Sequence, residues 1–207
     1  LAIACQQRSI RMVFTSTDLV FDGTQPPYSP EDPTCPVSTY GRHKVAAEQV
    51  IQQVYPEATI ARLPVMYGWP KVWRKNLLSA LVQQLAEGKT AYLFTDEFRS
   101  IAHAADVAEG LYLVANHPGR LFHLGGPAPV SRYAFGEAVR QLLDISPALI
   151  AGRQQAAVDL PAPRPRDVTL DSSAAAAIGF RPAAIPTVLP KLAPALRAWY
   201  AQWSNNG

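Results

Sequence analysis

Apolar and polar positions along the chain follow two alternating patterns. Short apolar runs rich in β-branched residues predict strands, and they cover Ile10–Ser16, Thr59–Leu63, Tyr92–Phe94 and Leu121–Leu124. Apolar residues spaced near the helical period predict helices at Leu1–Gln7, Tyr40–Val54, Leu77–Glu87, Asp106–Ala115, Tyr133–Leu143 and Lys191–Trp203. This alternation predicts an α/β fold with parallel strand pairing. The strand ends at Ser16, Leu63 and Leu124 should then line the sheet edge where ligands bind.

Single residues mark where some of these helices begin and end. Gly88 suits the position just beyond a helix C-terminus, because glycine tolerates a positive φ. Asp106 and Ser131 are candidate caps at the starts of their helices. From Ser146 onward the chain becomes rich in Ala and Pro and has few strong periods.

Composition narrows the class of protein. The chain has 207 residues, 48% of them hydrophobic, which is enough for a sizeable core. Its net charge is +3 (19 minus 16), but no charge run is present, which argues against a nucleic-acid arm or a disordered tail. Two cysteines, Cys5 and Cys35, predict a reducing compartment, taken as the cytoplasm. We expect no membrane span, no signal peptide and, since the four histidines lack zinc spacings, no metal site.

Three residues could carry out chemistry at the predicted sheet edge. Thr17 follows the first strand, and Tyr40 and Lys44 stand four residues apart on the next helix, so they share a face. An ammonium near a phenol favours the phenolate, and such a tyrosine can exchange a proton with a carbonyl or an alcohol. Taken alone, this spacing also fits a surface tyrosine and lysine on a solvated helix.

Longer motifs around Tyr40 and Lys44 strengthen the functional interpretation. The run Ser16–Gly23 (STDLVFDG), followed by Tyr40–Lys44 (YGRHK), resembles the active-site block of the extended short-chain dehydrogenases/reductases. More narrowly, it resembles their dTDP-4-dehydrorhamnose reductase branch. Later segments resemble the same branch in order, at Arg62–Pro64, Asp96–Ser100, Phe122–Gly126 and Arg164–Asp167. The resemblance therefore covers nearly the whole chain.

The resemblance implies roles for the matching residues. Tyr40 would be the general acid, Lys44 would support it, and Thr17 would orient the substrate carbonyl. The implied cofactor is NADP or NAD, held by Ser16, Tyr40, Lys44, Arg62, Leu63 and Pro64. The implied substrate is a nucleotide sugar, contacted by Asp18, Arg74, Lys75 and Arg99.

Some of these residues have a structural alternative. Arg99 could equally be an ordinary surface arginine. Arg164 and Arg166 could hold a phosphate, although pinning of the C-terminal segment by ion pairs is favoured. Trp69 and Trp73 could border a substrate pocket, whereas Trp199 and Trp203 are expected to pack in the core, as is His123.

The chain also departs from the branch. Leu19 stands where relatives usually have tyrosine, and Ile101–Ala105 replaces a usual proline and acidic residue. Related 4,6-dehydratases carry Thr-Asp-Glu where this chain has Thr17-Asp18-Leu19, so reduction is favoured over dehydration. A glycine-rich turn for the cofactor pyrophosphate is not found in the sequence. We therefore expect either a fragment or a shortened protein that binds NAD(P)H weakly by itself.

Taken together, the sequence predicts a Rossmann-like parallel sheet with a small C-terminal substrate lobe. Residues 1–145 would form the Rossmann-like part, with lobe insertions around 65–105, and residues 146–207 would complete the lobe. The predicted activity is NAD(P)H-dependent reduction of a keto-sugar nucleotide, with a homodimer as a possible assembly. The alternatives are a non-catalytic regulatory subunit of the same fold and an NAD-dependent epimerase.

Overall fold

The computed structural model describes residues 1–69, 76–160 and 162–204. Its helices are α1 (Ala2–Gln7), α2 (Thr39–Val54), α3 (Leu77–Ala86), α4 (Ala104–Val114), α5 (Arg132–Leu143), α6 (Ser173–Ala177) and α7 (Ile185–Ser204). Its strands are β1 (Val13–Thr17), β2 (Thr59–Leu63), β3 (Met66–Tyr67), β4 (Ala91–Phe94), β5 (Phe98–Arg99), β6 (Ala102–His103), β7 (Leu121–His123), β8 (Val130–Ser131) and β9 (Ile150–Arg153). Short 3-10 helices are η1 (Asp18–Val20), η2 (Pro147–Leu149) and η3 (Gln155–Ala157).

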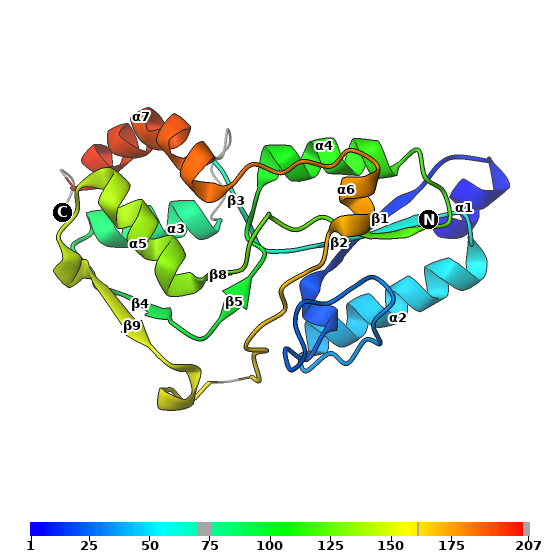
Figure 1. The fold of residues 1–207 in the computed structure, drawn as a ribbon, viewed down its shortest axis with the longest axis horizontal. Coiled ribbons are helices and arrows are strands. Elements are labelled where there is room, and N and C mark those ends of the chain that lie inside the picture. Colours follow the sequence, from blue (N-terminus) through cyan, green and yellow to red (C-terminus); the bar gives the residue numbers. More distant parts are fainter. Residues whose placement is uncertain (70–75, 161, 205–207) are drawn as a thin grey trace.

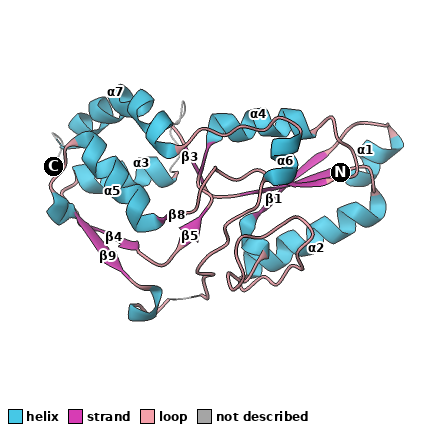
Figure 2. Ribbon diagram, viewed as in Figure 1, coloured by secondary structure: helices cyan, strands magenta, loops and turns pink. Residues whose placement is uncertain are grey.

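A three-stranded parallel sheet organises one half of the molecule. Its strand order is β1-β2-β7, with Thr17 opposite Leu63 and Arg62 opposite His123. The predicted α/β fold with a Rossmann-like parallel sheet is therefore confirmed, and the carboxyl ends of the three strands share one edge (Figure 2). The first strand begins later than predicted, at Val13, because the Ile10 N–H still bonds back to Cys5 in the turn after α1. Thr17 is thus the last residue of β1, not the first one beyond it.

Helices cover both faces of this sheet. Figure 1 shows α2 on one face and α4 with α6 on the other. On the α4 side, Val107, Phe122 and Phe180 are buried in one apolar cluster. On the α2 side, Ile51 and Tyr55 pack with Ala58. Burial on both faces explains why the residues of β2 are buried along its whole length.

A second lobe lies beyond the carboxyl edge of the sheet. Helices α3, α5 and α7 pack together over the parallel pair β4-β9 (Figure 1). Their shared core includes Leu78, Leu85, Phe135, Leu196 and Trp199. Trp203 packs against the same core, as predicted for the last helix. The division of the chain at residue 145 stays a prediction; α5, which precedes it, contacts α7, which follows it.

Helix ends agree with the sequence at some positions and differ at others. Gly88 has a φ of 67° after α3, and the Ser131 side chain caps α5 by accepting from the Ala134 N–H, as predicted. Asp106 does not cap α4, which already begins at Ala104; its carboxylate accepts from the Ala183 N–H instead. The last helix begins at Ile185, earlier than predicted, and continues through two prolines because its first turns are buried against the second lobe.

Candidate active site

Thr17 lies at the carboxyl edge of the sheet, where β1 gives way to η1. Its hydroxyl accepts a hydrogen bond from the Leu19 N–H at 3.2 Å, which starts the 3-10 turn. The same hydroxyl donates to the Asp18 carboxylate at 3.1 Å. Both Thr17 and Asp18 are buried. A hydroxyl and a carboxylate are therefore fixed side by side at the end of β1.

The N-terminus of α2 brings Tyr40 to the same place. The Ser38 side chain caps this helix by accepting from the Gly41 N–H at 3.0 Å. A side chain at Gly41 would overlap the carbonyl oxygen of Leu19, so glycine permits the close approach of α2 to η1. Tyr40 remains 52% exposed at this junction.

Lys44 lies one turn further along α2. Its ammonium donates to the Thr15 carbonyl oxygen at 2.8 Å and lies 4.8 Å from the centre of the Phe14 ring. The distance from the ammonium to the centre of the Tyr40 ring is 5.9 Å. The predicted pair is thus anchored to β1, with the lysine charge close to the tyrosine ring.

Thr17 and Tyr40 line one cavity of about 460 Å³, named here the Thr17 cavity. Asp18, Pro64 and Arg99, three further residues from the sequence prediction, also line it. The opposite wall comes from the second half of the chain, with Arg132, Pro163 and Arg164. The cavity therefore lies between the sheet edge and the second lobe.

Charged groups dominate one wall of the Thr17 cavity. Arg99 lies 3.8 Å from the Asp18 carboxylate and 3.5 Å from that of Glu97. All three are buried, with Glu97 only 1% exposed. Burial raises the pKa of Asp18 from 3.8 to about 6, and the nearby Arg99 charge offsets only part of this effect. The Asp18 and Glu97 carboxylates each keep one buried oxygen without a hydrogen-bond partner among the described residues.

Arg99 is neither a surface arginine nor a free cation. Besides the two carboxylates, its guanidinium donates to the carbonyl oxygens of Phe98, Pro165 and Arg166. Its NH1 and NH2 groups donate within the protein and its Nε faces Asp18 at 3.8 Å, so Arg99 acts as an internal counter-ion at the cavity wall. Direct contact between Arg99 and a substrate phosphate stays a prediction.

Arg62 departs from the role that the resemblance implied. Its side chain is buried and pairs with Glu48 through two hydrogen bonds, of 3.1 and 2.8 Å. The guanidinium also lies over the Phe21 ring and 3.4 Å from the Nε2 atom of His123. The Arg62 side chain therefore belongs to the core, and only the neighbouring Leu63 and Pro64 stand at the strand end.

The remaining predicted residues fall into three groups. Ser16 is buried, and its hydroxyl has no hydrogen-bond partner among the described residues. Arg74, Lys75 and Trp73 lie outside the described residues. Trp69 packs edge-on against Trp199 at 5.0 Å between ring centres and so joins the second-lobe core.

Sequence reasoning missed the roles of two site residues, Glu97 and Arg132. The Arg132 Nε donates to Glu97 at 2.9 Å across 35 residues of chain, and no local pattern reports such a contact. The one available signal was the position of Arg132 directly after the Ser131 cap, which orients the first turn of α5. Arg164, expected to pin the C-terminal segment, lies 3.6 Å from the same Glu97 and also lines the cavity.

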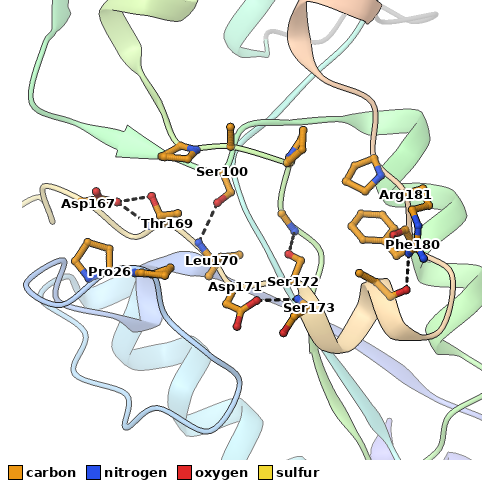
Figure 3. A pocket seen from close by; sticks show the side chains of 18 residues that line it. Pro26, Ser100, Asp167, Thr169, Leu170, Asp171, Ser172, Ser173, Phe180 and Arg181 are labelled. Atoms are coloured by element: carbon orange, nitrogen blue, oxygen red, sulfur yellow. Dashed lines mark hydrogen bonds between the residues drawn. The ribbon is translucent and has the colours of Figure 1, made fainter.

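A larger cavity, of about 660 Å³, is named here the Ser100 cavity (Figure 3). Its walls combine prolines and apolar residues, including Pro26 and Phe180, with polar ones such as Asp167 and Ser172. Two of its hydroxyl groups accept hydrogen bonds from backbone groups distant in the sequence: Ser100 from the Leu170 N–H and Ser172 from the Gly125 N–H, both at 2.9 Å. Because none of the predicted catalytic residues lines it, the Thr17 cavity is the candidate active site.

The described residues also bear on metal sites and membrane spans. Across residues 1–69, 76–160 and 162–204, no three His, Cys, Asp or Glu side chains gather as metal ligands would. Each helix within the same ranges is too short or too polar to span a lipid bilayer.

The chain matches one known family and several known proteins. Residues 1–196 match the family described as RmlD substrate binding domain. A probable low-salt glycan biosynthesis reductase of Haloferax volcanii is 35% identical over 84% of this chain and 59% of its own length. The dTDP-4-dehydrorhamnose reductase of Mycobacterium tuberculosis is 33% identical over 88% of this chain and 62% of its own length. The chain thus spans about three fifths of these curated relatives.

Other relatives and solved structures add context. The methionine adenosyltransferase 2 subunit beta of Rattus norvegicus is 26% identical over 82% of this chain and 52% of its own length. The dTDP-4-dehydrorhamnose reductase of Bacillus anthracis, solved in complex with NADP, has a TM-score of 0.79 at 20% identity, covering 87% of this chain and 63% of that one. The Yersinia enterocolitica reductase has a TM-score of 0.83 at 22% identity, covering 94% and 70%. These structures share the fold of this chain.

Proposed function

Because the chain belongs to the RmlD substrate binding domain family, we propose that it carries the catalytic part of an NAD(P)H-dependent reductase of a keto-sugar nucleotide. The observation that carries the proposal is the meeting of Thr17 and Tyr40 in one cavity, with Lys44 one turn from Tyr40. Relatives named as keto-sugar reductases, from Mycobacterium tuberculosis and Streptomyces, support the substrate class.

Proton delivery is the task of Tyr40. Its half-exposed side chain lines the Thr17 cavity, so its hydroxyl can reach a keto oxygen bound there. Lys44, with its charge close to the Tyr40 ring, stabilises the negative charge that remains on the tyrosine after proton transfer. Thr17 orients the same keto oxygen: its hydroxyl proton, now directed at Asp18, can rotate toward the cavity.

The residues at the sheet edge also fit a nicotinamide cofactor, NADP or NAD. The buried Ser16 hydroxyl lacks a partner among the described residues, which suits a ligand hydrogen bond at the end of β1. Tyr40 and Lys44 would hold the ribose, with Leu63 and Pro64 beside the ring. When bound, this group supplies the hydride for the keto carbon. The relative from Bacillus anthracis was solved in complex with NADP.

A regulatory subunit is the second candidate function. It is favoured by the relationship to the rat methionine adenosyltransferase 2 subunit beta. The intact set of Thr17, Tyr40 and Lys44 favours the enzyme. An epimerase would use the same three residues and would differ from the reductase in its product.

The proposal also includes a cytoplasmic location and assembly as a homodimer. The free thiols of Cys5 and Cys35 support the location.

Replacement of the tyrosine hydroxyl tests the catalytic role. In the gene product that contains residues 1–207, Tyr40→Phe should lower kcat for reduction of dTDP-4-dehydrorhamnose by roughly 10²–10⁴-fold, the usual contribution of a general acid. Affinity for NADPH should stay within a few-fold of the parent. Tyr112→Phe, on an 81% exposed tyrosine of α4, is the matched control and should leave kcat unchanged. Parental turnover by Tyr40→Phe would refute the assignment.

A further inference from the structure

A buried glutamate continues the line of Tyr40 and Lys44 along α2. Tyr40, Lys44 and Glu48 stand four residues apart, so their side chains share one face of the helix. Lys44 donates to the Thr15 carbonyl oxygen on β1, and Glu48 accepts two hydrogen bonds from Arg62 on β2. The face of α2 that carries the proposed general acid is therefore bonded to two neighbouring strands.

The contact between Glu48 and Arg62 is a two-bonded ion pair. The Arg62 Nε atom donates to Oε1 of Glu48 at 3.1 Å, and its Nη2 atom donates to Oε2 at 2.8 Å. Each residue is only 4% exposed. Two parallel bonds between a planar guanidinium and a planar carboxylate fix the angle between the groups as well as their distance. This fork therefore defines how α2 lies on β2.

Arg62 is also held on its other side. Its Nη1 atom lies 3.4 Å from Nε2 of His123 on β7 and 3.5 Å from the Pro30 carbonyl oxygen. Because a guanidinium only donates, Nε2 is the acceptor and the proton of the neutral ring is on Nδ1. That proton is donated to the Tyr28 carbonyl oxygen, 3.1 Å away. Arg62 is thus a fixed point on the sheet to which α2 is attached.

This fixed point is close to the reacting groups. Arg62 is opposite Ser16 in the parallel register of β1 and β2, and Ser16 directly precedes Thr17. Glu48 is one helical turn from Lys44. A shift at the ion pair would therefore reach Thr17 within one residue of strand and Lys44 within one turn of helix.

Stability alone does not account for the ion pair. Val45 and Ile51 of α2 pack in apolar clusters, which attach the helix to the protein. Such contacts are not directional, so they allow the helix to slide or rotate. The desolvation of two buried charges offsets much of their attraction, so the pair of Glu48 and Arg62 adds little net stability. What the fork adds is a defined position of α2.

We propose that Glu48 and Arg62 are positioning residues of the reduction, because their fork holds α2 where Lys44 and Tyr40 meet Thr17. This inference rests on the proposed function. Neither residue is among the described residues that line the Thr17 cavity, so both act through the two residues of α2 that do the chemistry.

The double variant Glu48→Leu/Arg62→Met, in the gene product that contains this chain, removes the fork and keeps apolar bulk in its place. It should stay folded, since apolar replacement of a whole buried pair is often neutral for stability. Its kcat for reduction of dTDP-4-dehydrorhamnose should fall by roughly 10–10²-fold, because a displacement of about 1 Å costs that much. KM for the keto sugar should stay within a few-fold of the parent.

A second variant, Arg62→Lys, keeps the charge and covers the case in which the double variant does not fold. It should give a smaller fall in kcat, because lysine lacks the planar fork. Glu137→Leu/Arg140→Met is the matched control, since this pair, 3.2 Å apart, lies within α5. The control should keep the parental kcat. Parental kcat in the folded double variant or in Arg62→Lys, or an equal fall in the control, refutes the positioning role.

A spectroscopic measurement separates this inference from the proposed function. The Lys44 ammonium lies over the Phe14 ring, 4.8 Å from its centre, so the ring current moves the adjacent methylene signal of Lys44 upfield. In NMR spectra of lysine-labelled protein, with Lys44→Arg for assignment, this upfield shift should be lost in Glu48→Leu/Arg62→Met and kept in Glu137→Leu/Arg140→Met. An unmoved Lys44 signal refutes the positioning role, whatever the parent reduces. If the shift is lost but the parent reduces no keto sugar, the proposed function is wrong and the fork still positions Lys44.

Discussion

At the scale of single residues, two buried ionisable side chains respond to pH in opposite directions. Burial and the Arg62 charge lower the pKa of His123 from 6.5 to about 4. The neutral ring is held by the Tyr28 carbonyl oxygen, 3.1 Å from its Nδ1. A lowered pKa stabilises the fold above pH 6.5, and this stability is lost as pH falls toward 4. Asp18, whose pKa is raised to about 6, has the opposite effect. Its contribution to the stability of the fold is largest below pH 3.8 and is lost as pH rises through 6.

The variant His123→Gln isolates the histidine contribution, since glutamine does not titrate. Between pH 7.5 and pH 4.5 the parent should lose about 2–3 kcal/mol more unfolding free energy than the variant, given ~1.4 kcal/mol per pKa unit. Urea unfolding at the two pH values measures the difference, in which the Asp18 effect cancels. His43→Gln, on an exposed position of α2, should behave like the parent. Equal acid sensitivity in His123→Gln and the parent would contradict the assigned cause.

At the scale of elements, the approach of α2 to η1 decides whether the site forms. A methyl group at Gly41 would overlap the Leu19 carbonyl oxygen and lie 2.8 Å from the Pro36 Cβ. Gly41→Ala should therefore move α2 away from η1, destabilise the protein by about 1–3 kcal/mol, as overpacking does, and lower turnover. Gly68→Ala is the control, because its new Cβ would meet only ordinary contacts, at 3.5 Å and beyond. Urea denaturation and turnover rates of both variants test this prediction. A fully active, fully stable Gly41→Ala would show that the close approach of α2 to η1 is not required.

The elements that the sequence predicts well are those with strong local signals. β2 matches its predicted range at both ends, and Gly88 and Ser131 stop and start their helices as expected. The early start of α7 was missed because Pro186 and Pro190 read as helix breakers, whereas burial of Ile185, Val188 and Leu189 stabilises the helix there. Two-residue strands such as β3 and β5 carry no periodic signal, since their pairing depends on distant segments.

In the candidate site, too, the residues with local sequence signals were predicted and those joined by long-range contacts were not. Thr17, Tyr40 and Lys44 were found from their spacing and from the resemblance, because they lie within 28 residues (17 to 44), on β1 and α2. The charged wall joins Glu97 to Arg132, 35 residues away, and to Arg164 on another segment. Such contacts form only when the second lobe folds against the sheet, so the local sequence pattern does not predict them.

At the scale of the whole molecule, the segment from residue 165 to 171 joins the sheet half to the second lobe. Its backbone bonds to Tyr28 on the β1–α2 loop and to Phe98 on β5. The Leu170 N–H donates to the buried hydroxyl of Ser100 at 2.9 Å. The same segment continues from Arg164 at the Thr17 cavity, so its attachment also fixes one wall of that cavity.

Ser100→Ala would leave the buried Leu170 N–H without its acceptor. We expect a loss of about 1–3 kcal/mol in unfolding free energy, the cost of an unsatisfied buried donor. For a chain of this size each kcal/mol lowers Tm by roughly 2–4 °C. Ser173→Ala, at an exposed serine of α6, is the control and should keep the parental Tm. An unchanged Tm in Ser100→Ala would mean that this attachment contributes little.

The proposed reaction delivers a hydride to the keto carbon and a proton to its oxygen at the Thr17 cavity. The most direct measurement uses NADPH that carries deuterium in place of both nicotinamide C4 hydrogens, and follows the deuterium into the product of dTDP-4-dehydrorhamnose by mass spectrometry and NMR. We expect one deuterium at the former keto carbon for each NADPH oxidised by the gene product that contains this chain. Tyr40→Phe should abolish that transfer. A product without deuterium, an epimer formed without net NADPH oxidation, or no turnover by the parent would contradict it.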